Sequence, residues 1–244
     1  MKRRRGAAGL GIGMAENRAL PLKRLTLPRG AGVALWLAGP ASPGDVPEHL
    51  WNTLSSSETD RANRFLRAED RALFALTRGT LRRLLSEATG VAADKIAFAE
   101  GPYGKPCLVG THGPHFNVSH SGSWALIGFS GSRDIGVDIE FMRAAGGELD
   151  LARSFFSAAE CRSLEGQDRG MLLSSFYKIW TCKEAVLKAH GAGISEHLKD
   201  FSVELTEDGY AIHPEPACFS PSLASVAVQP VEVPEGYAGC CALA

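Results

Sequence analysis

The chain has 244 residues, of which 45% are hydrophobic and 22% charged, and its formal net charge is −1. This length and composition predict a soluble globular protein with one domain or two small ones. A net charge this small gives no indication of a nucleic-acid partner, and no apolar segment is long enough to span a membrane. Six cysteines without a C-x-x-C pair indicate reduced thiols in a cytoplasmic protein rather than a disulfide framework.

The N-terminal segment is basic over residues 1–5 and rich in Gly and Ala over residues 7–14. It has too few large apolar residues for the core of a signal peptide, and Glu16, Asn17 and Arg18 follow directly. We therefore expect residues 1–28 to form a disordered extension, with the native start at either Met1 or Met14.

The first half of the chain predicts a strand, two helical segments and then three more strands. The strands are expected at residues 33–38, 96–98, 115–119 and 124–129. A capping box, Ser55 with Glu58, precedes a long helix over residues 69–88 that ends at Gly90. The core stripe of this helix is Leu73, Thr77, Leu81 and Leu84, and Arg71, Arg78 and Arg82 share another side.

The second half repeats this order of elements. A strand at residues 135–141 precedes a capping box, Ser157 with Glu160, and a helix over residues 170–189 that ends at Gly191. Further strands are expected at residues 201–205, 210–212, 224–228 and 239–243. The repeat predicts an α+β fold of two similar lobes related by a pseudo-two-fold axis, at residues 29–131 and 132–244.

Acidic residues stand out in the second half. Asp138 and Glu140 alternate along a strand and so project from one face, and Glu184 and Lys188 lie one turn apart on a helix. Three acids that could meet beside a lysine suggest a divalent cation that holds a phosphate ester. Each segment by itself is also typical of an exposed strand face or an ordinary helix ion pair.

The second long helix predicts two adjacent stripes. Leu172, Phe176, Ile179 and Val186 can face a core, and Tyr177, Trp180, Glu184 and Lys188 lie beside them. Such a helix holds functional groups in register next to a packed face. Lys183 points elsewhere, and we interpret it as a structural lysine.

Several motifs occur in a characteristic order along the chain. They are Tyr103-Gly104-Lys105-Pro106, Phe116-Asn117-Val118-Ser119-His120-Ser121, Gly136-Val137-Asp138-Ile139-Glu140, Phe155-Phe156-Ser157 and Trp180-x-x-Lys183-Glu184-Ala185-x-x-x-Lys188. As a set they resemble the 4′-phosphopantetheinyl transferase superfamily, over about residues 33–243 in element order. The closer match is its larger, pseudodimeric, surfactin-synthetase-activating branch, which activates peptide and polyketide synthetases.

The resemblance implies an enzyme that moves 4′-phosphopantetheine from coenzyme A to a serine of a carrier protein and releases 3′,5′-ADP. It implies a Mg2+ ion, with Mn2+ as an alternative, held by Asp138 and Glu184. Glu140 is either a third ligand or a base acting through water. Glu184 is also a candidate acceptor of the serine proton, since a serine is a poor nucleophile until a base takes its proton.

The same resemblance implies how coenzyme A is held. Lys188 contacts the pyrophosphate, Ser119 and His120 contact the pyrophosphate and the 3′-phosphate, and Lys105 lies near the adenine and the 3′-phosphate. Arg61 matches a basic position that binds the 3′-phosphate. Glu58 stands where a basic residue is common, which weakens this contact or moves it to Arg64 or Arg71.

Carrier proteins of this chemistry are acidic helical domains, by resemblance. The expected docking surface is the loop at residues 144–151 with the helix at residues 157–164, and the candidate contacts are Phe155, Phe156 and Arg162. The carrier is of the peptide-synthetase, polyketide or fatty-acid type, and the enzyme is expected to be a cytoplasmic monomer. Two other functions compete: a non-catalytic module that binds coenzyme A or the carrier, and a metal-dependent nucleotide phosphohydrolase.

Overall fold

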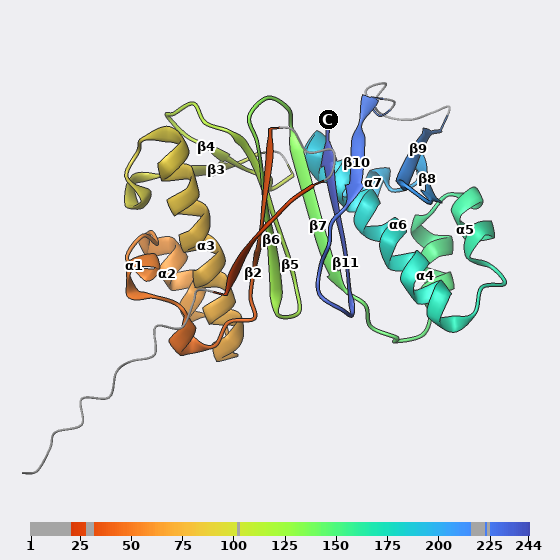
Figure 1. Cartoon of the computed structure of the whole chain (residues 1–244), viewed down its shortest axis with the longest axis horizontal. Coiled ribbons are helices and arrows are strands. Elements are labelled where there is room, and N and C mark those ends of the chain that lie inside the picture. The colour runs from red at the N-terminus through yellow and green to blue at the C-terminus, as the bar shows by residue number, and fades with distance from the viewer. Residues whose placement is uncertain (1–20, 28–31, 102, 216–222, 224) are drawn as a thin grey trace, which may run out of the picture.

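The protein, seen in a computed structural model, is described over residues 21–27, 32–101, 103–215, 223 and 225–244. Two sheets pack against each other in the middle of the molecule, and helices cover the outer side of each (Figure 1). The core between the sheets is made of aliphatic side chains from β2, β6 and β7, including Leu37, Leu126 and Val137. This architecture confirms the predicted α+β fold.

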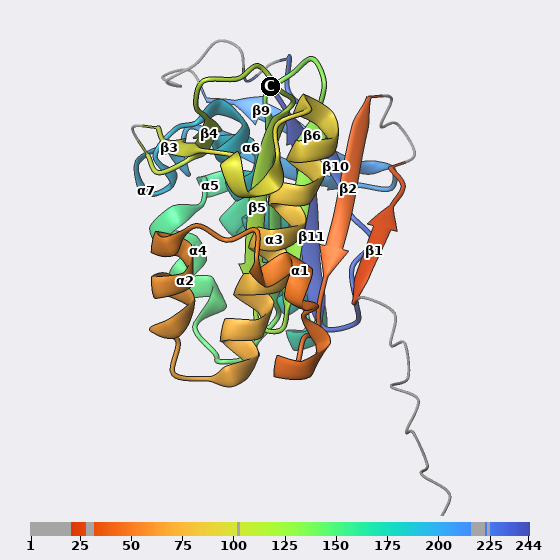
Figure 2. The same ribbon diagram turned by 90° about the vertical axis from the view of Figure 1, so that its left-hand side faces the viewer.

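The first half has a four-stranded antiparallel sheet in the order β1-β2-β6-β5. Its strands are β1 (Leu22–Leu25), β2 (Val33–Ala38), β5 (His115–Ser121) and β6 (Trp124–Ser130), and β3 (Phe98–Glu100) pairs with β4 (Pro106–Leu108). Its helices are α1 (Glu48–Trp51), α2 (Ser56–Asn63) and α3 (Ala68–Thr89), with 3-10 turns at Pro43–Asp45 and Ala93–Lys95. Viewed from the helical side of this half, α3 crosses in front of the sheet (Figure 2).

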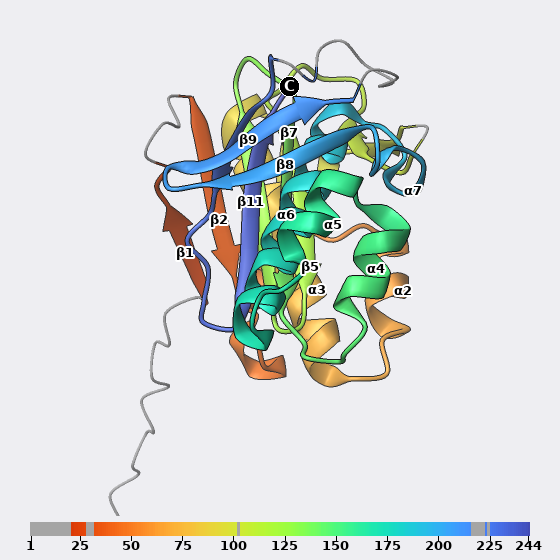
Figure 3. The same cartoon turned by 90° about the vertical axis from the view of Figure 1, so that its right-hand side faces the viewer.

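The second half has a three-stranded antiparallel sheet in the order β10-β11-β7. Its strands are β7 (Ile135–Phe141), β10 (Ala227–Pro230) and β11 (Tyr237–Leu243), and β8 (Phe201–Thr206) forms a hairpin with β9 (Gly209–Pro214). Its helices are α4 (Glu148–Phe155), α5 (Ala158–Leu164), α6 (Arg169–His190) and α7 (Ile194–His197). The hairpin crosses over α6, and α4 and α5 lie against the same helix (Figure 3).

The helix boundaries follow from local chemistry. Both predicted capping boxes are present, because Ser55 and Ser157 each accept a backbone N–H while Glu58 and Glu160 accept a backbone N–H in return. The helices α3 and α6 end at Gly90 and Gly191 in the left-handed conformation that glycine adopts readily.

Some predicted boundaries are corrected. Residues 22–25, assigned to a disordered extension, form β1 and pair with β2, while residues 1–20 lie outside the described residues. The loop expected at residues 144–151 already contains the start of α4, and β4 is a strand that the sequence did not predict. The strand expected at residues 96–98 begins at Phe98, and the one expected at residues 224–228 begins at Ala227, with residue 224 outside the described residues.

The strands β5 and β7 meet at the boundary between the halves through side chains rather than a backbone ladder. Asn117 Oδ1 accepts the N–H of Val137 at 2.9 Å, and Ser121 Oγ accepts the N–H of Phe141 at 3.1 Å. Partners that advance together along both strands mean that β5 and β7 run in the same direction. This contact fixes the register of β7, the strand that carries two of the predicted acids.

Candidate active site at the boundary between the halves

Three carboxylates converge at this boundary, as predicted. Asp138 and Glu140 project from β7 and Glu184 from α6, and one oxygen of each lies within 4.8 Å of the others. Asp138 is fully buried, whereas Glu140 and Glu184 are half-buried. The close approach of α6 depends on Gly136, where any Cβ would collide with the backbone of Ala185 and Ala189.

Lys188 reaches into this acid cluster. Its Nζ lies 2.6 Å from Asp138 Oδ1 and 3.0 Å from Glu184 Oε2, and it also donates to Ser119 Oγ at 3.3 Å. The lysine thus binds one acid on its own helix and one on the facing strand. A simple exposed pair with Glu184 is excluded, since the Lys188 side chain is only 20% exposed and the Asp138 side chain 0%.

Two serines of β5 hold the acids of β7. Ser119 Oγ donates to Asp138 Oδ1 at 2.7 Å, and Ser121 Oγ donates to Glu140 Oε2 at 2.7 Å. His120 lies between the two serines and Ile139 between the two acids, and both point the other way because alternate residues of a strand share a face. Side chains of the first half therefore orient two carboxylates of the second half, Asp138 and Glu140.

Burial sets the charge state of the cluster. It raises the pKa of Asp138, an effect that the positive charge of Lys188 opposes, and it raises the pKa of Glu140 against the hydrogen bond from Ser121. For Glu184, burial and the charge of Asp138 both raise the pKa. Burial would lower the pKa of Lys188, but the charges of Asp138 and Glu184 outweigh it and raise the pKa.

The cluster fits a hard divalent cation. Within the described part of the chain, Asp138 Oδ2 is buried without a hydrogen-bond partner, although buried polar atoms almost always have one. Three carboxylates offer the oxygen ligands that Mg2+ and Mn2+ prefer. An ion among them would satisfy this oxygen and offset the mutual repulsion of the acids.

Two neighbouring cavities share Gly104, Pro106 and Val118 in their linings, and the smaller one reaches the cluster at Lys188. One has a volume of about 420 Å³ and is lined by Arg61, Phe74, Arg78 and His120, among others. The second, of about 330 Å³, is lined by Lys105, Asn117, Val118 and Lys188, among others. Cationic groups thus continue from Lys188 into a space that could hold a phosphorylated ligand.

Comparison with known proteins identifies the family of this site. The family described as "4′-phosphopantetheinyl transferase superfamily" matches residues 134–229, and the one described as "4′-phosphopantetheinyl transferase, N-terminal" matches residues 46–130. The chain is 33% identical to 4′-phosphopantetheinyl transferase Sfp of Bacillus subtilis, over 78% of this chain and 82% of Sfp. The chain belongs to the 4′-phosphopantetheinyl transferase superfamily.

Other members of this superfamily show a similar relationship. The 4′-phosphopantetheinyl transferase HetI of Nostoc sp. is 37% identical over 71% of this chain and 74% of HetI. The putative 4′-phosphopantetheinyl transferase slr0495 of Synechocystis sp. is 42% identical, with a match that spans 58% of either chain. The predicted family, its Sfp-like type and the enzyme class, a transferase of the 4′-phosphopantetheinyl group, are confirmed.

In this transferase, Arg64 and Arg71, the alternatives to Arg61 as partners of the 3′-phosphate, lie outside the cavity that contains His120. Arg61 and Arg78 line the same cavity as His120, whereas Arg64 and Arg71 do not line it. Arg71 instead stacks over Trp51 at 5.2 Å. Glu58 is bound by Arg78 at 3.4 Å and by Arg82 at 2.8 Å, so this acid is neutralised from within the first half.

Arg78 could have been selected from the sequence only by its position in the helix. It lies four residues before Arg82 on the same side of α3, and Arg82 is buried and donates to the carbonyls of Ala93 and Ile96. Sequence alone does not reveal which of two such arginines is structural.

Lys183 is structural, as we interpreted it. Its Nζ lies 3.0 Å from Glu160 Oε1 and donates to the carbonyl oxygens of Leu198 and Phe201. Burial lowers its pKa and the charge of Glu160 opposes that shift. The second capping box is therefore linked through Glu160 to α6 and β8.

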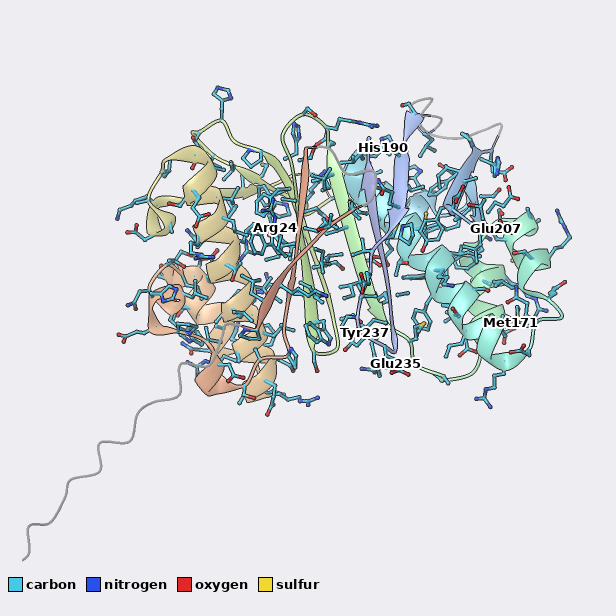
Figure 4. The ribbon with its side chains drawn as sticks, in the orientation of Figure 1. Arg24, Met171, His190, Glu207, Glu235 and Tyr237 are labelled. Atoms are coloured by element: carbon cyan, nitrogen blue, oxygen red, sulfur yellow. The ribbon has the colours of Figure 1, made fainter. Side chains whose placement is uncertain are left out.

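Lys105 lies at the far end of the boundary. Its Nζ donates to the carbonyl oxygen of Ala189 at 3.0 Å and lies 3.6 Å from Asp134, and burial lowers its pKa. His190 and Tyr237, labelled in Figure 4, lie toward opposite ends of this boundary. Lys105 therefore reaches the C-terminal end of α6 at the residue that directly follows Lys188.

The expected docking residues are only partly available at the surface. Arg162 is exposed on α5, and Leu151 on α4 is 46% exposed. Phe155 is half-buried and packs edge-on against Trp180. Phe156 is only 2% exposed and belongs to the core with Phe176, so it is excluded as a contact of a partner.

Proposed function

We propose that this protein transfers 4′-phosphopantetheine from coenzyme A to the hydroxyl of a carrier-protein serine and releases 3′,5′-ADP. The observation that carries the proposal is the acid cluster of Asp138, Glu140 and Glu184 beside Lys188, in a chain of this superfamily. The activity is assigned to a monomer, because both similar halves lie in one chain, and to the cytoplasm, because the described cysteines are free thiols. No helix in the described residues is long and apolar enough to span a membrane.

The acid cluster is the proposed metal site, with Asp138, Glu140 and Glu184 as ligands of Mg2+ or Mn2+. Such an ion, when bound, stabilises the charge that develops on the pyrophosphate oxygens during phosphoryl transfer. Glu184, whose pKa is raised by burial and by Asp138, accepts the proton of the attacking serine, directly or through a water molecule.

The cationic residues form the proposed coenzyme A site. Lys188 holds the pyrophosphate, with Ser119 and His120 beside it, and Lys105 lies near the adenine. Arg61 and Arg78, which line one cavity with His120, are the proposed partners of the 3′-phosphate. Charge-assisted contacts of this kind are about twice as strong as neutral ones.

The direct test is the intact mass of an apo carrier protein after incubation with the enzyme, coenzyme A and Mg2+. A mass gain of one phosphopantetheine, with release of 3′,5′-ADP, supports the transfer. Hydrolysed coenzyme A with an unmodified carrier would support a phosphohydrolase, and binding alone a non-catalytic module. Asp138→Ala should lower turnover by orders of magnitude and leave the fold intact, as judged by circular dichroism.

The carrier is proposed to dock on the loop after β7 together with α4 and α5. Leu151 and Arg162 are the exposed apolar and basic groups there that fit an acidic helical domain. Arg162→Glu should raise the carrier KM and leave the affinity for coenzyme A unchanged, since charges at the rim of an interface act mainly on association. An unchanged carrier KM would remove α5 from the interface.

A further inference from the structure

Ser121 is the last residue of β5, and its hydroxyl bridges the two halves. It donates to Glu140 Oε2 at 2.7 Å and accepts the N–H of Phe141 at 3.1 Å. The backbone bond fixes the hydroxyl over β7, so that its proton can point only toward the carboxylate beside it. Glu140 Oε2 accepts this hydrogen bond, and the carboxylate keeps further lone pairs for another ligand.

Ser119 donates a hydrogen bond to Asp138 in the same way, but it also contacts Lys188. Its hydroxyl donates to Asp138 Oδ1, and Lys188 and the N–H of Ile139 donate to it. A change at Ser119 would therefore disturb the lysine and the acid together. A substitution of Ser121 tests one acid at a time, because among the described residues its hydroxyl forms hydrogen bonds only with Glu140 and the backbone of β7.

Glu140 needs such an anchor more than the other acids do. It lies one residue before the end of β7, it is half-buried, and the next residue, Phe141, is 38% exposed. A glutamate in that position has three rotatable side-chain torsions and access to water. Holding it in one conformation therefore costs conformational entropy. The short hydrogen bond to its carboxylate supplies a charge-assisted contact that holds it toward Asp138 and Glu184.

We propose that Ser121 is a positioning residue of the metal site, which holds Glu140 as a ligand of the divalent cation. The inference rests on the proposed function, in which Glu140 is a ligand of the cation. The hydrogen bond from Ser121 restrains the carboxylate of Glu140 close to the carboxylates of Asp138 and Glu184. A metal ligand needs such a fixed position beside the other ligands, and Ser121 supplies it.

The test is calorimetric titration of Mg2+ into the full chain without coenzyme A. Ser121→Ala should weaken Mg2+ binding about 10-fold to 100-fold, the usual effect of losing a group that orients a metal ligand. Ser121→Thr keeps the hydroxyl and should restore the affinity. In the transfer assay the loss should appear as a higher Mg2+ concentration for half-maximal rate rather than as a lower maximal rate.

Two controls separate positioning from general damage. Ser130→Ala removes a serine of β6 whose hydroxyl accepts the N–H of Arg133 and contacts no acid, and it should bind Mg2+ like the wild type. On a Glu140→Ala background, Ser121→Ala should have no further effect on Mg2+ affinity. An additive loss in that double variant would mean that Ser121 does not act through Glu140 and would overturn the inference.

The inference and the proposed function fail in different ways. A wild-type protein with no Mg2+-dependent transfer would contradict the proposed function. Mg2+-dependent transfer in the wild type with unchanged Mg2+ affinity in Ser121→Ala would overturn only the role of Ser121. A lower maximal rate at saturating Mg2+, with normal Mg2+ affinity, would make Glu140 a base instead.

Discussion

The ammonium of Lys188 acts as a counter-charge for the acids at the site. It contacts Asp138 at 2.6 Å and Glu184 at 3.0 Å, so it compensates part of the repulsion between two buried carboxylates. The same ammonium is proposed to hold the pyrophosphate of coenzyme A. It must therefore exchange carboxylate oxygens for phosphate oxygens when the substrate binds.

This exchange predicts opposite effects of one substitution on two ligands. Lys188→Met keeps the length of the side chain and removes its charge, so Mg2+ should bind more tightly in the absence of coenzyme A. Coenzyme A should bind less tightly by about 1.5–3 kcal/mol, the cost of a charge-assisted contact, or roughly 10-fold to 100-fold in Kd. Separate calorimetric titrations measure both, and normal affinity for coenzyme A would reduce Lys188 to a structural residue.

His120 gives the site a dependence on pH. Burial lowers its pKa below the ordinary value, and the charges of Lys188 and Arg61 lower it further, so its imidazole is neutral at pH 7 in the free protein. Since the folded state then holds fewer protons than the unfolded chain, stability falls as the pH drops from the ordinary histidine pKa through the lowered one. A bound phosphate reverses this preference and favours the imidazolium.

Coenzyme A should therefore bind with uptake of a proton on His120. Its affinity should gain several-fold from His120 as the pH falls from 7.5 to 6, a gain that His120→Gln should abolish. Calorimetry in buffers of different ionisation enthalpy measures the proton uptake. The His120→Gln variant also corrects for protonation of the substrate phosphate, and an identical pH dependence in the two proteins would contradict the assignment.

At the scale of elements, the site depends on how closely α6 lies on β7. Gly136 has no side chain where α6 crosses the strand, and the backbone of Ala185 and Ala189 occupies the space that a Cβ would need. Glu184 directly precedes Ala185 in the helix, and Asp138 lies two residues after Gly136 in the strand. The distance between the acids is thus set by packing of backbone on backbone.

Gly136→Ala should separate the helix from the strand. The extra methyl group meets backbone that cannot rotate away, so we expect a loss of at least about 1–3 kcal/mol in the free energy of unfolding, with weaker Mg2+ binding. Urea unfolding and Mg2+ titration measure the two effects. Gly131→Ala is the matched control, because a Cβ there meets nothing within 4 Å and should leave both values near the wild type.

At the scale of the whole molecule, the two halves share the boundary between β5 and β7. The buried side chain of Asn117 accepts the N–H of Val137 there, and the aliphatic core between the sheets draws on both halves. The residues proposed to bind coenzyme A come mainly from the first half, and the carboxylates proposed to bind the metal come from the second. Assembly of the site therefore requires both halves in one register.

Asn117→Ala should weaken this boundary without touching an acid. The buried N–H of Val137 loses its partner, which costs about 1–3 kcal/mol. Calorimetry should show a melting temperature lower by several degrees and a single transition, because the halves unfold together. Asn63→Ala, at an exposed position on α2, is the control. Equal melting temperatures for the two variants would show that the Asn117 contact does not stabilise the boundary.

The sequence by itself determined the features that depend on local chemistry and on motifs. The two capping boxes, the glycine ends of α3 and α6 and the strand at residues 135–141 follow from residues close together in the chain. The motifs indicated the family, and alternation in a strand with helical spacing predicted that Asp138, Glu140 and Glu184 would meet. These predictions succeeded because each rests on a short-range period.

Only the tertiary structure decided which residues distant in sequence face each other. It placed Arg78 rather than Arg64 or Arg71 in the cavity with His120, it buried Phe156, and it added β1 to the first sheet. It also brought Ser121 to Glu140 across the boundary of the halves. Such contacts depend on the register of β5 against β7 and on the packing of α6, and neither is encoded in the spacing of any single segment.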